Sequence, residues 1–420
     1  MRWPGAAAVT VSVVHLAKGR SRNRVAVRLG NRAVPVINTR LGDTPERDDP
    51  KPLFPNGAAS YLGSKIYGQG FILTTSERDE LVARDARNAE RIFPYLGGEE
   101  VNTSPTQHFD RYVINFGQMV LEEAEGWPEL LSIVRRTVKA ERDRLKDNAD
   151  GRQYKARWWQ YGRVMPALYA AIAPLARCLV TACVSKHLMF SFQPTDRIFS
   201  HKLIVFPLDR YSAFAVLQSR LHVAWTWLLS STLETRLNYS ASDCFENFPF
   251  PEPDPRAVLP GLEAAGEALY AARAQYMVET QQGLTETYNQ LKDPACLDAT
   301  VLALRRLHES LDRAVLEAYG WGDLEVPPYC PVNEAEAMAV KAFEGEVIDR
   351  LYQLNAARAE AERAEAELAQ ATAGLAAASG ARQGGGAGAR PAAKKAAAKK
   401  TAKKAAAKKR AGGDGQGTMF

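Results

Sequence analysis

Glu234 and Arg236 are the residues of this chain whose types and spacing most directly suggest chemistry. They stand close together in a segment that the sequence predicts to be extended, so both side chains should point to the same side. A carboxylate can accept a hydrogen bond from the N4 amino group of cytosine, and a guanidinium can donate to O6 and N7 of guanine. The pair therefore suits the reading of base edges, and an ordinary surface ion pair is the alternative.

Basic and aromatic residues alternate over residues 152–163, which read Arg-Gln-Tyr-Lys-Ala-Arg-Trp-Trp-Gln-Tyr-Gly-Arg. This pattern suits a groove that holds the backbone and the bases of a nucleic acid together. The alternative is a buried Trp pair covered by Arg side chains whose charged ends stay in water. The candidate DNA contacts in this segment are Lys155, Arg157 and Arg163.

The stretch from Leu130 to Lys146 is predicted to be an amphipathic helix. Its apolar residues should face the core, and its cations recur at steps of three and four residues on the outer face. Such a stripe contacts phosphates or is simply a solvated face. The apolar positions are Leu130, Val134, Val138 and Leu145, and the cations are Arg135, Lys139, Arg142 and Lys146.

Two polar pairs, Lys186-His187 and His201-Lys202, follow apolar strands. A histidine that is hydrogen-bonded within the core is the alternative to a functional one. No third ligand with suitable spacing accompanies the two histidines, so the sequence predicts no zinc site. We take Lys186, His187 and Lys202 as further candidate DNA contacts, and the sequence offers no catalytic residue.

Length and composition limit the class of protein. The chain has 420 residues, of which 46% are hydrophobic, so two or three domains with a sizeable core are expected. No run of apolar residues is long enough to span a membrane, and no signal peptide is visible. The five cysteines are scattered without a Cys-x-x-Cys motif, which favours a reducing compartment. We therefore expect a cytoplasmic protein, located at the nucleoid, with no membrane partner.

Charge is concentrated at the C-terminal end. Residues 379–420 contain eight Lys and three Arg against one Asp, a net charge of +10, whereas the whole chain carries +6. The rest of the chain is therefore mildly acidic, and it can bind DNA only through a local basic surface. The Ala-Ala-Lys-Lys repeats of this tail cannot form a core, so the sequence predicts that the tail is disordered.

The periodicity predicts an α+β fold followed by an all-α part. Residues 1–253 mix helices with alternating strands, a mixed-sheet domain that ends in a Pro-rich boundary. Residues 256–330 are predicted to be a helical domain, 331–378 a charged helix or coiled-coil arm, and 379–420 the basic tail. The predicted strands are Val9–Val13, Val25–Leu29, Lys65–Leu73, Arg111–Phe116, Leu179–Val184 and Leu203–Phe206.

Several segments resemble type IIG and type IIL (MmeI-like) restriction–modification enzymes. Within residues 222–251, a helix with two Trp residues leads through Glu234 and Arg236 to the exit Tyr-Ser-Ala-Ser-Asp-Cys-Phe-Glu-Asn-Phe-Pro-Phe-Pro, which is similar to the end of that family's target-recognition domain. The likeness extends over roughly residues 1–355. Its other segments are Arg2–Gly5, Val9–His15, Pro94–Asn102, Arg111–Phe116, Trp158–Arg163, Val184–His187 and Asp312–Trp321.

The resemblance implies sequence-specific binding of double-stranded DNA by the C-terminal part of a site-specific adenine-N6 DNA methyltransferase. The family's catalytic part has a Gly-rich S-adenosylmethionine loop and an Asn-Pro-Pro-Tyr/Phe motif, and neither is found here. Val326-Pro327-Pro328-Tyr329 lacks the Asn. We therefore expect no cofactor in this chain, no activity of the chain alone, and S-adenosylmethionine in a separate or upstream methyltransferase or endonuclease polypeptide.

Two other classes of protein stay open. Because the Lys-rich tail resembles the tails of linker histones, the chain could be a nucleoid-associated DNA-binding protein. It could also be an enzyme with an unrecognised active site. The motif-rich residues 1–253 favour the fragment or specificity subunit of a restriction–modification enzyme.

Overall fold

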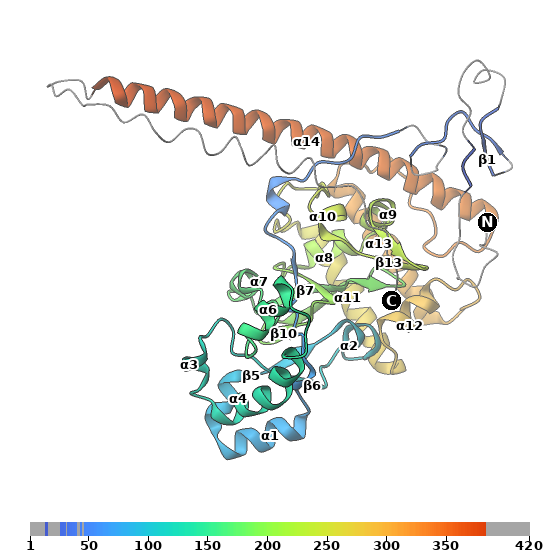
Figure 1. The fold of residues 1–420 in the computed structure, drawn as a ribbon. Coiled ribbons are helices and arrows are strands. Elements are labelled where there is room, and N and C mark those ends of the chain that lie inside the picture. The colour runs from blue at the N-terminus through green and yellow to red at the C-terminus, as the bar shows by residue number, and fades with distance from the viewer. Residues whose placement is uncertain (1–12, 16–25, 31, 40–42, 44–45, 384–420) are drawn as a thin grey trace. The chain divides into compact units, whose positions relative to one another are not determined.

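The computed structural model describes residues 13–15, 26–30, 32–39, 43 and 46–383 (Figure 1). The described residues up to Arg363 belong to one compact unit, and the second unit begins at Ala364. The predicted strand at Val9–Val13 lies outside the described residues except for Val13, which is not in a strand. The predicted disorder of the tail also lies outside them, apart from residues 379–383, which continue the helix α14.

The first sheet is mixed, with the strand order β10-β5-β6-β4. β10 runs parallel to β5, and the other pairs are antiparallel. The core of this part contains Val113 of the sheet and Phe71, which precedes β4. The helix α4 and the π-helical turn η5 add Leu130, Val134 and Val138 to it. The elements are β4 (Ile72–Leu73), α1 (Thr75–Arg84), β5 (Ile92–Leu96), α2 (Gly98–Thr103), β6 (Arg111–Ile114), α3 (Leu121–Ala124), α4 (Pro128–Val134), η5 (Arg135–Lys139), α5 (Ala140–Arg142) and β10 (Ile198–Phe199).

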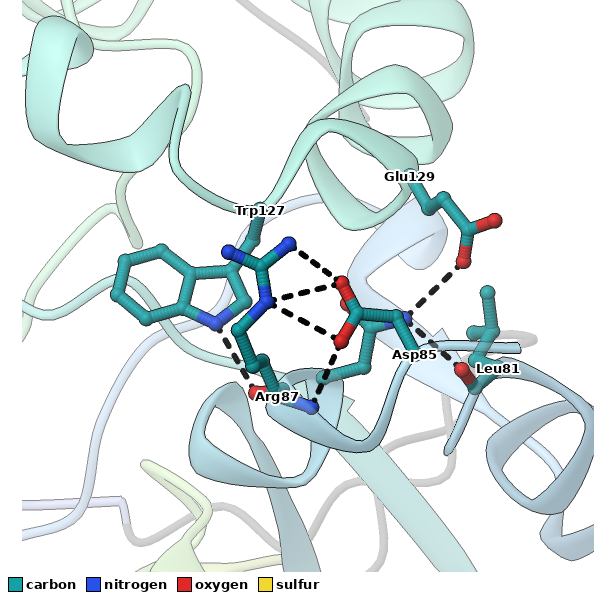
Figure 2. A network of polar contacts seen from close by, with 6 residues as sticks. Leu81, Asp85, Arg87, Trp127 and Glu129 are labelled. Carbon is teal, nitrogen blue, oxygen red and sulfur yellow. Dashed lines mark hydrogen bonds and ion pairs between the residues drawn. The ribbon is translucent and has the colours of Figure 1, made fainter. Parts of the chain in front are cut away.

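A polar network joins the end of α1 to the start of α4 (Figure 2). The buried amide of Asn88 donates to the carboxylate of Glu129 at 3.1 Å. Asp85 accepts from the backbone of Arg87 at 2.9 Å and from its guanidinium, and these hydrogen bonds lower the pKa of Asp85. The indole of Trp127 donates to the carbonyl of Arg87 at 3.0 Å. The turn between α1 and β5 is thereby fixed against α4.

The second sheet is antiparallel, with the order β3-β11-β7-β9, and its strands β7, β9 and β11 are mostly buried. A small third sheet has the order β12-β13-β8. The elements are β1 (Arg28–Leu29), β2 (Arg32–Ala33), β3 (Tyr61–Leu62), α6 (Ala149–Ala156), α7 (Pro166–Ile172), β7 (Arg177–Ala182), β8 (Val184–Ser185), β9 (Ser191–Pro194), β11 (Leu203–Phe206), α8 (Tyr211–Gln218), α9 (Arg220–Leu229), β12 (Ser231–Leu233), β13 (Arg236–Asn238) and α10 (Ala241–Cys244).

Helices follow residue 256, as predicted. α11 packs against both α8 and α13. Leu269 of α11 and Leu304 of α13 therefore belong to the same hydrophobic core as Phe214 of α8. The helical part thus shares a core with the preceding α+β part, and the boundary at residue 253 stays a prediction. The helices are α11 (Pro260–Thr280), α12 (Leu284–Leu291), α13 (Ala299–Ala318) and α14 (Glu334–Gln383).

The predicted fold class, α+β with mixed sheets followed by helices, is confirmed. The strands predicted at 111–116, 179–184 and 203–206 are present, with small shifts at their ends. The strand predicted from Lys65 to Leu73 is wrong except for its last two residues. Tyr67 and Gly68 have φ angles of 52° and 141°, and such values break an extended chain.

Candidate nucleic-acid interface

Backbone pairings bring basic residues from separate segments together beside the second sheet. Lys65 and Arg163 exchange two backbone hydrogen bonds of 3.1 Å. His201 donates its backbone N–H to Ser64 at 2.9 Å, which places the β10–β11 turn beside Lys65. Burial lowers the pKa of His201, and the nearby charges of Lys65 and Lys202 lower it further. Cations from three segments therefore lie close to one another.

The same series of pairings continues into the third sheet. Cys183 donates its N–H to the carbonyl of Lys202 at 2.8 Å, and its own carbonyl accepts from Tyr239 at 2.8 Å. β8 follows directly and pairs with β13, which carries Arg236. We call the cations aligned in this way the basic row. It consists of Arg163, Lys65, Lys202, Lys186 and Arg236, of which all but the half-buried Lys65 are exposed.

Glu234 and Arg236 lie at the tip of the β12–β13 hairpin. Leu233 pairs with Arg236, so Glu234 and Thr235 form the turn, and Glu234 has a φ of 58°. The prediction that both residues lie in an extended segment is therefore wrong for Glu234, because the chain reverses there. The two side chains still meet, in an exposed ion pair of 2.9 Å. Their role in reading bases stays a prediction.

Lys186 and His187 both contact Asn289 on α12. Lys186 Nζ donates to Asn289 Oδ1 at 2.7 Å, and His187 Nε2 lies 3.0 Å from the same atom. Burial lowers the pKa of His187, while the hydrogen bond to Asn289 acts in the opposite direction. His187 is thus a half-buried, hydrogen-bonded histidine, whereas the exposed Lys186 stays a candidate DNA contact.

The helix from Pro128 to Arg142 contains the π-helical turn η5. Arg135 is exposed and lies over the ring of Trp158 at 5.5 Å, and Lys139 forms an ion pair of 2.7 Å with Asp143. The prediction that Arg142 lies on the outer face with them is wrong, since Arg142 is 1% exposed. A π-helical turn makes i→i+5 hydrogen bonds and so rotates the following residues relative to a regular α-helix. This rotation directs Arg142 inward.

Arg142 binds backbone carbonyls of two segments that are separate in the sequence. Nη2 donates to Tyr67 at 2.8 Å and to Ile66 at 3.2 Å. Nη1 donates to Gln160 at 2.8 Å and to Arg157 at 3.0 Å. The guanidinium therefore ties the loop after Lys65 to the segment after α6.

The surface above Arg142 carries a pair of tyrosines. Tyr67 and Tyr154 have ring centroids 4.7 Å apart, and Lys65 Nζ lies 5.4 Å from the Tyr67 ring. Lys155 follows Tyr154 in α6, and Arg157 caps the C-terminal end of that helix. We call these five residues the Tyr67 patch. Lys65 and Tyr67 were not among the candidates from the sequence, because the break after Ile66 falls within an alternating apolar pattern.

The Val326-Pro327-Pro328-Tyr329 segment is part of the interior. Tyr329 is 6% exposed and stacks on His308 with ring centroids 4.2 Å apart. The carbonyls of Pro327 and Pro328 accept hydrogen bonds from Arg220 at 2.7 and 3.0 Å. A tyrosine that is already stacked and buried does not fit the stacking of a flipped base or the binding of S-adenosylmethionine.

Metal-binding clusters and membrane-spanning helices are both absent from the described part of the chain. No group of three or more His, Cys, Asp or Glu side chains there could hold a metal ion. None of the helices there combines the length and the apolar content that a membrane span needs.

Comparisons with known proteins address the same region. A family model described as the target recognition domain of MmeI matches residues 50–252. DNA methyltransferase A of Bacillus subtilis (strain 168) is 32% identical over 125 residues, which are 30% of this chain and 13% of that protein. The type IIL restriction-modification enzyme MmeI, solved in complex with DNA, has a similar fold with a TM-score of 0.55 and 20% identity. That match covers 77% of this chain and 39% of the MmeI chain, so this chain spans only a small part of each relative.

Proposed function

We propose that this chain recognises a specific sequence in double-stranded DNA, because residues 50–252 match the family model described as the target recognition domain of MmeI. It would do so as the recognition part of a site-specific adenine-N6 DNA methyltransferase or restriction–modification enzyme. The geometry that supports this best is the β12–β13 hairpin, which holds the exposed Glu234–Arg236 pair at one end of the basic row.

The two parts of this surface suit the two parts of a DNA site. Lysine and arginine bind phosphates without regard to sequence, and they fix the register of a protein on the duplex. A two-stranded ribbon fits the major groove, where each base pair presents its own pattern of donors and acceptors. We propose that the basic row binds phosphates while Glu234 and Arg236 read base edges.

Selection from randomised duplexes tests this proposal. The full chain is incubated with the pool above 150 mM salt, because salt weakens phosphate binding more than base reading, and bound duplexes are sequenced over several rounds. We expect one asymmetric consensus to be enriched. Enrichment of no sequence, with binding that depends only on salt, would favour the nucleoid-associated alternative.

We further propose that methyl transfer belongs to a separate or upstream catalytic polypeptide, which would bind S-adenosylmethionine. The interior position of Tyr329 supports this division, since the ring in the nearest lookalike of the flipped-base motif is buried and stacked on His308. Calorimetry with S-adenosylmethionine should give no binding heat, and a tritium-transfer assay on plasmid DNA should give no signal. Methyl transfer by the pure chain would contradict the division of labour, whereas transfer that needs the added polypeptide would support it.

A further inference from the structure

Arg142 is a buried cation whose hydrogen bonds, in the described part of the chain, all go to backbone carbonyls. It is 1% exposed, and it donates to Ile66 and Tyr67 on one side and to Arg157, Trp158 and Gln160 on the other. A buried charge is costly unless many polar groups solvate it. The carbonyls of both segments must therefore converge on the guanidinium, which fixes the two segments relative to each other.

The fixed segments are those that carry the Tyr67 patch. Tyr67 has a φ of 52°, an uncommon value for a residue other than glycine, and its carbonyl accepts from two nitrogens of Arg142. The Tyr154 ring lies 5.6 Å from the guanidinium carbon and packs on Tyr67. Strain of this kind persists only where the surrounding structure enforces it. Arg142 supplies that restraint.

The charge of the patch indicates its ligand. Lys65 Nζ lies 5.4 Å from the Tyr67 ring, and Lys155 and Arg157 are close to Tyr154 in the sequence at the end of α6. No acidic residue is within ion-pair distance of these three cations in the described chain. The positive charge of Arg142 lies beneath the two rings, where burial lowers its pKa and where the carbonyl dipoles and the neighbouring Glu141 carboxylate offset the charge. Such a surface attracts phosphates, and tyrosine hydroxyls also bind phosphate oxygens in DNA complexes.

We propose that Arg142 is a positioning residue that holds the Tyr67 patch in the arrangement needed to bind the sugar–phosphate backbone of duplex DNA. This inference rests on the proposed function. It adds a second contact area beside the basic row, joined to it at Lys65, and it gives a functional reason for the π-helical turn that directs Arg142 inward.

Arg142→Lys is the test variant, because lysine keeps the charge but cannot form the fork of hydrogen bonds to both segments. Arg305→Lys is the matched control. Arg305 is also buried, at 7% exposure, and it donates to the carbonyls of Leu291, Gln290 and Asp293 between α12 and α13, away from the patch. Arg142→Lys disturbs contacts to five carbonyls and Arg305→Lys contacts to three, so the control also breaks a buried set of carbonyl contacts.

We expect Arg142→Lys to weaken binding of the selected duplex by about tenfold at a temperature well below its Tm, with the consensus unchanged. The slope of log K against log salt should become shallower by about two, since each lost phosphate contact removes about 0.9. Phosphate-ethylation interference should disappear at one cluster of phosphates. Arg305→Lys should lower the Tm but leave affinity, slope and interference pattern as in the wild type.

Tyr67→Gly keeps the proposal testable if Arg142→Lys does not fold. Glycine adopts the positive φ without strain, so the variant removes the ring and leaves the backbone in place. It should fold and bind DNA more weakly, with interference lost at the same phosphates. Wild-type affinity of Tyr67→Gly, or equal effects of Arg142→Lys and Arg305→Lys on DNA binding, would overturn the inference. If the wild type itself selects no consensus, the proposed function fails instead.

Discussion

Glu234 occupies a conformation that glutamate rarely adopts. Its φ of 58° places it in the left-handed region, where a Cβ costs roughly 1–2 kcal/mol. The side chain is 69% exposed, so burial does not explain why a glutamate occupies the turn. An exposed acidic side chain at a strained hairpin tip is the kind of local outlier that is often tied to binding.

Exchanging the charges of the tip residues tests their role. Glu234→Lys with Arg236→Asp places a donor where an acceptor stood, and the reverse at the second position. We expect the selected consensus to change at a single base pair while the overall affinity for the new site is retained, since a bidentate contact gives about 1–3 kcal/mol of discrimination. An unchanged consensus with a lower Tm would mean that the pair is only a structural ion pair.

His222 makes the stability of the fold depend on pH. It is buried, its Nε2 lies 3.1 Å from the hydroxyl of Tyr239, and burial lowers its pKa from 6.5 to about 3. In the unfolded chain the imidazole of His222 is therefore protonated below about pH 6.5, whereas in the folded chain it stays neutral down to about pH 3. The stabilising contribution of neutral His222 is complete above pH 6.5 and is lost as the pH falls.

The expected loss is about 1.4 kcal/mol in the free energy of unfolding per pH unit below 6.5 for each such histidine. Burial lowers the pKa of His308 as well, so the slope should exceed that of one proton. Urea unfolding at pH 7, 6, 5 and 4.5 measures it, and His222→Gln should reduce the slope by one proton. An NMR resonance of His222 that titrates near pH 6.5 would contradict this account.

At the level of elements, the sequence correctly predicted the strands and helices whose apolar residues recur because one face is buried. β6, β11 and the helices after residue 256 follow apolar periodicities that a buried face requires, so they could be read directly. The π-helical turn η5 could not be predicted in this way. It inserts one extra residue into the helix, and such an insertion produces no apolar pattern at the usual helical spacing of three and four residues. The prediction for Arg142 failed for this reason, and with it the connection to Lys65 and Tyr67.

The same limit applies to the candidate site. Glu234 and Arg236 were found from residue type and spacing, but the hairpin that carries them lacks the Asn-Gly or Asp-Gly turn that marks such reversals in sequence. The alignment of Lys65, Arg163 and Lys202 depends on isolated backbone pairings between distant segments. Pairings of that kind involve too few residues to produce an alternating pattern.

The contact between α8 and α11 tests whether the helical part is one folding unit with the α+β part. A Cβ on Gly266 would lie 2.5 Å from the carbonyl oxygen of Tyr211, so one of the two helices would have to move. We expect Gly266→Ala to reduce the free energy of unfolding by about 1–3 kcal/mol, in a single cooperative transition. Both circular dichroism and tyrosine fluorescence should follow that transition.

Gly261→Ala is the control in the same helix, because nothing lies within 4 Å of its added Cβ. It should leave stability unchanged or raise it by up to about 1 kcal/mol, since alanine favours the helix over glycine. If Gly266→Ala melts in two steps, with only one affected, the two parts are separate folding units despite their common core.

At the scale of the whole molecule, we expect the basic tail to strengthen binding to any DNA and the rest of the chain to provide the sequence specificity. The tail, residues 379–420, holds a net charge of +10, and the rest of the chain is mildly acidic. We expect deletion of the tail to flatten the salt slope by several units, at about 0.9 per phosphate contact. Binding should weaken equally on all duplexes, as fluorescence anisotropy over a salt series would measure. A changed consensus with an unchanged slope would mean that the tail reads sequence.

The central claim is that this chain distinguishes one DNA sequence from others. The most direct measurement is equilibrium competition between the selected duplex and a scrambled duplex of equal length and composition, with the full chain at physiological salt. Specific DNA-binding proteins favour their sites by about 10³-fold or more, and we expect a ratio in that range. Equal affinity for the two duplexes would contradict sequence-specific recognition.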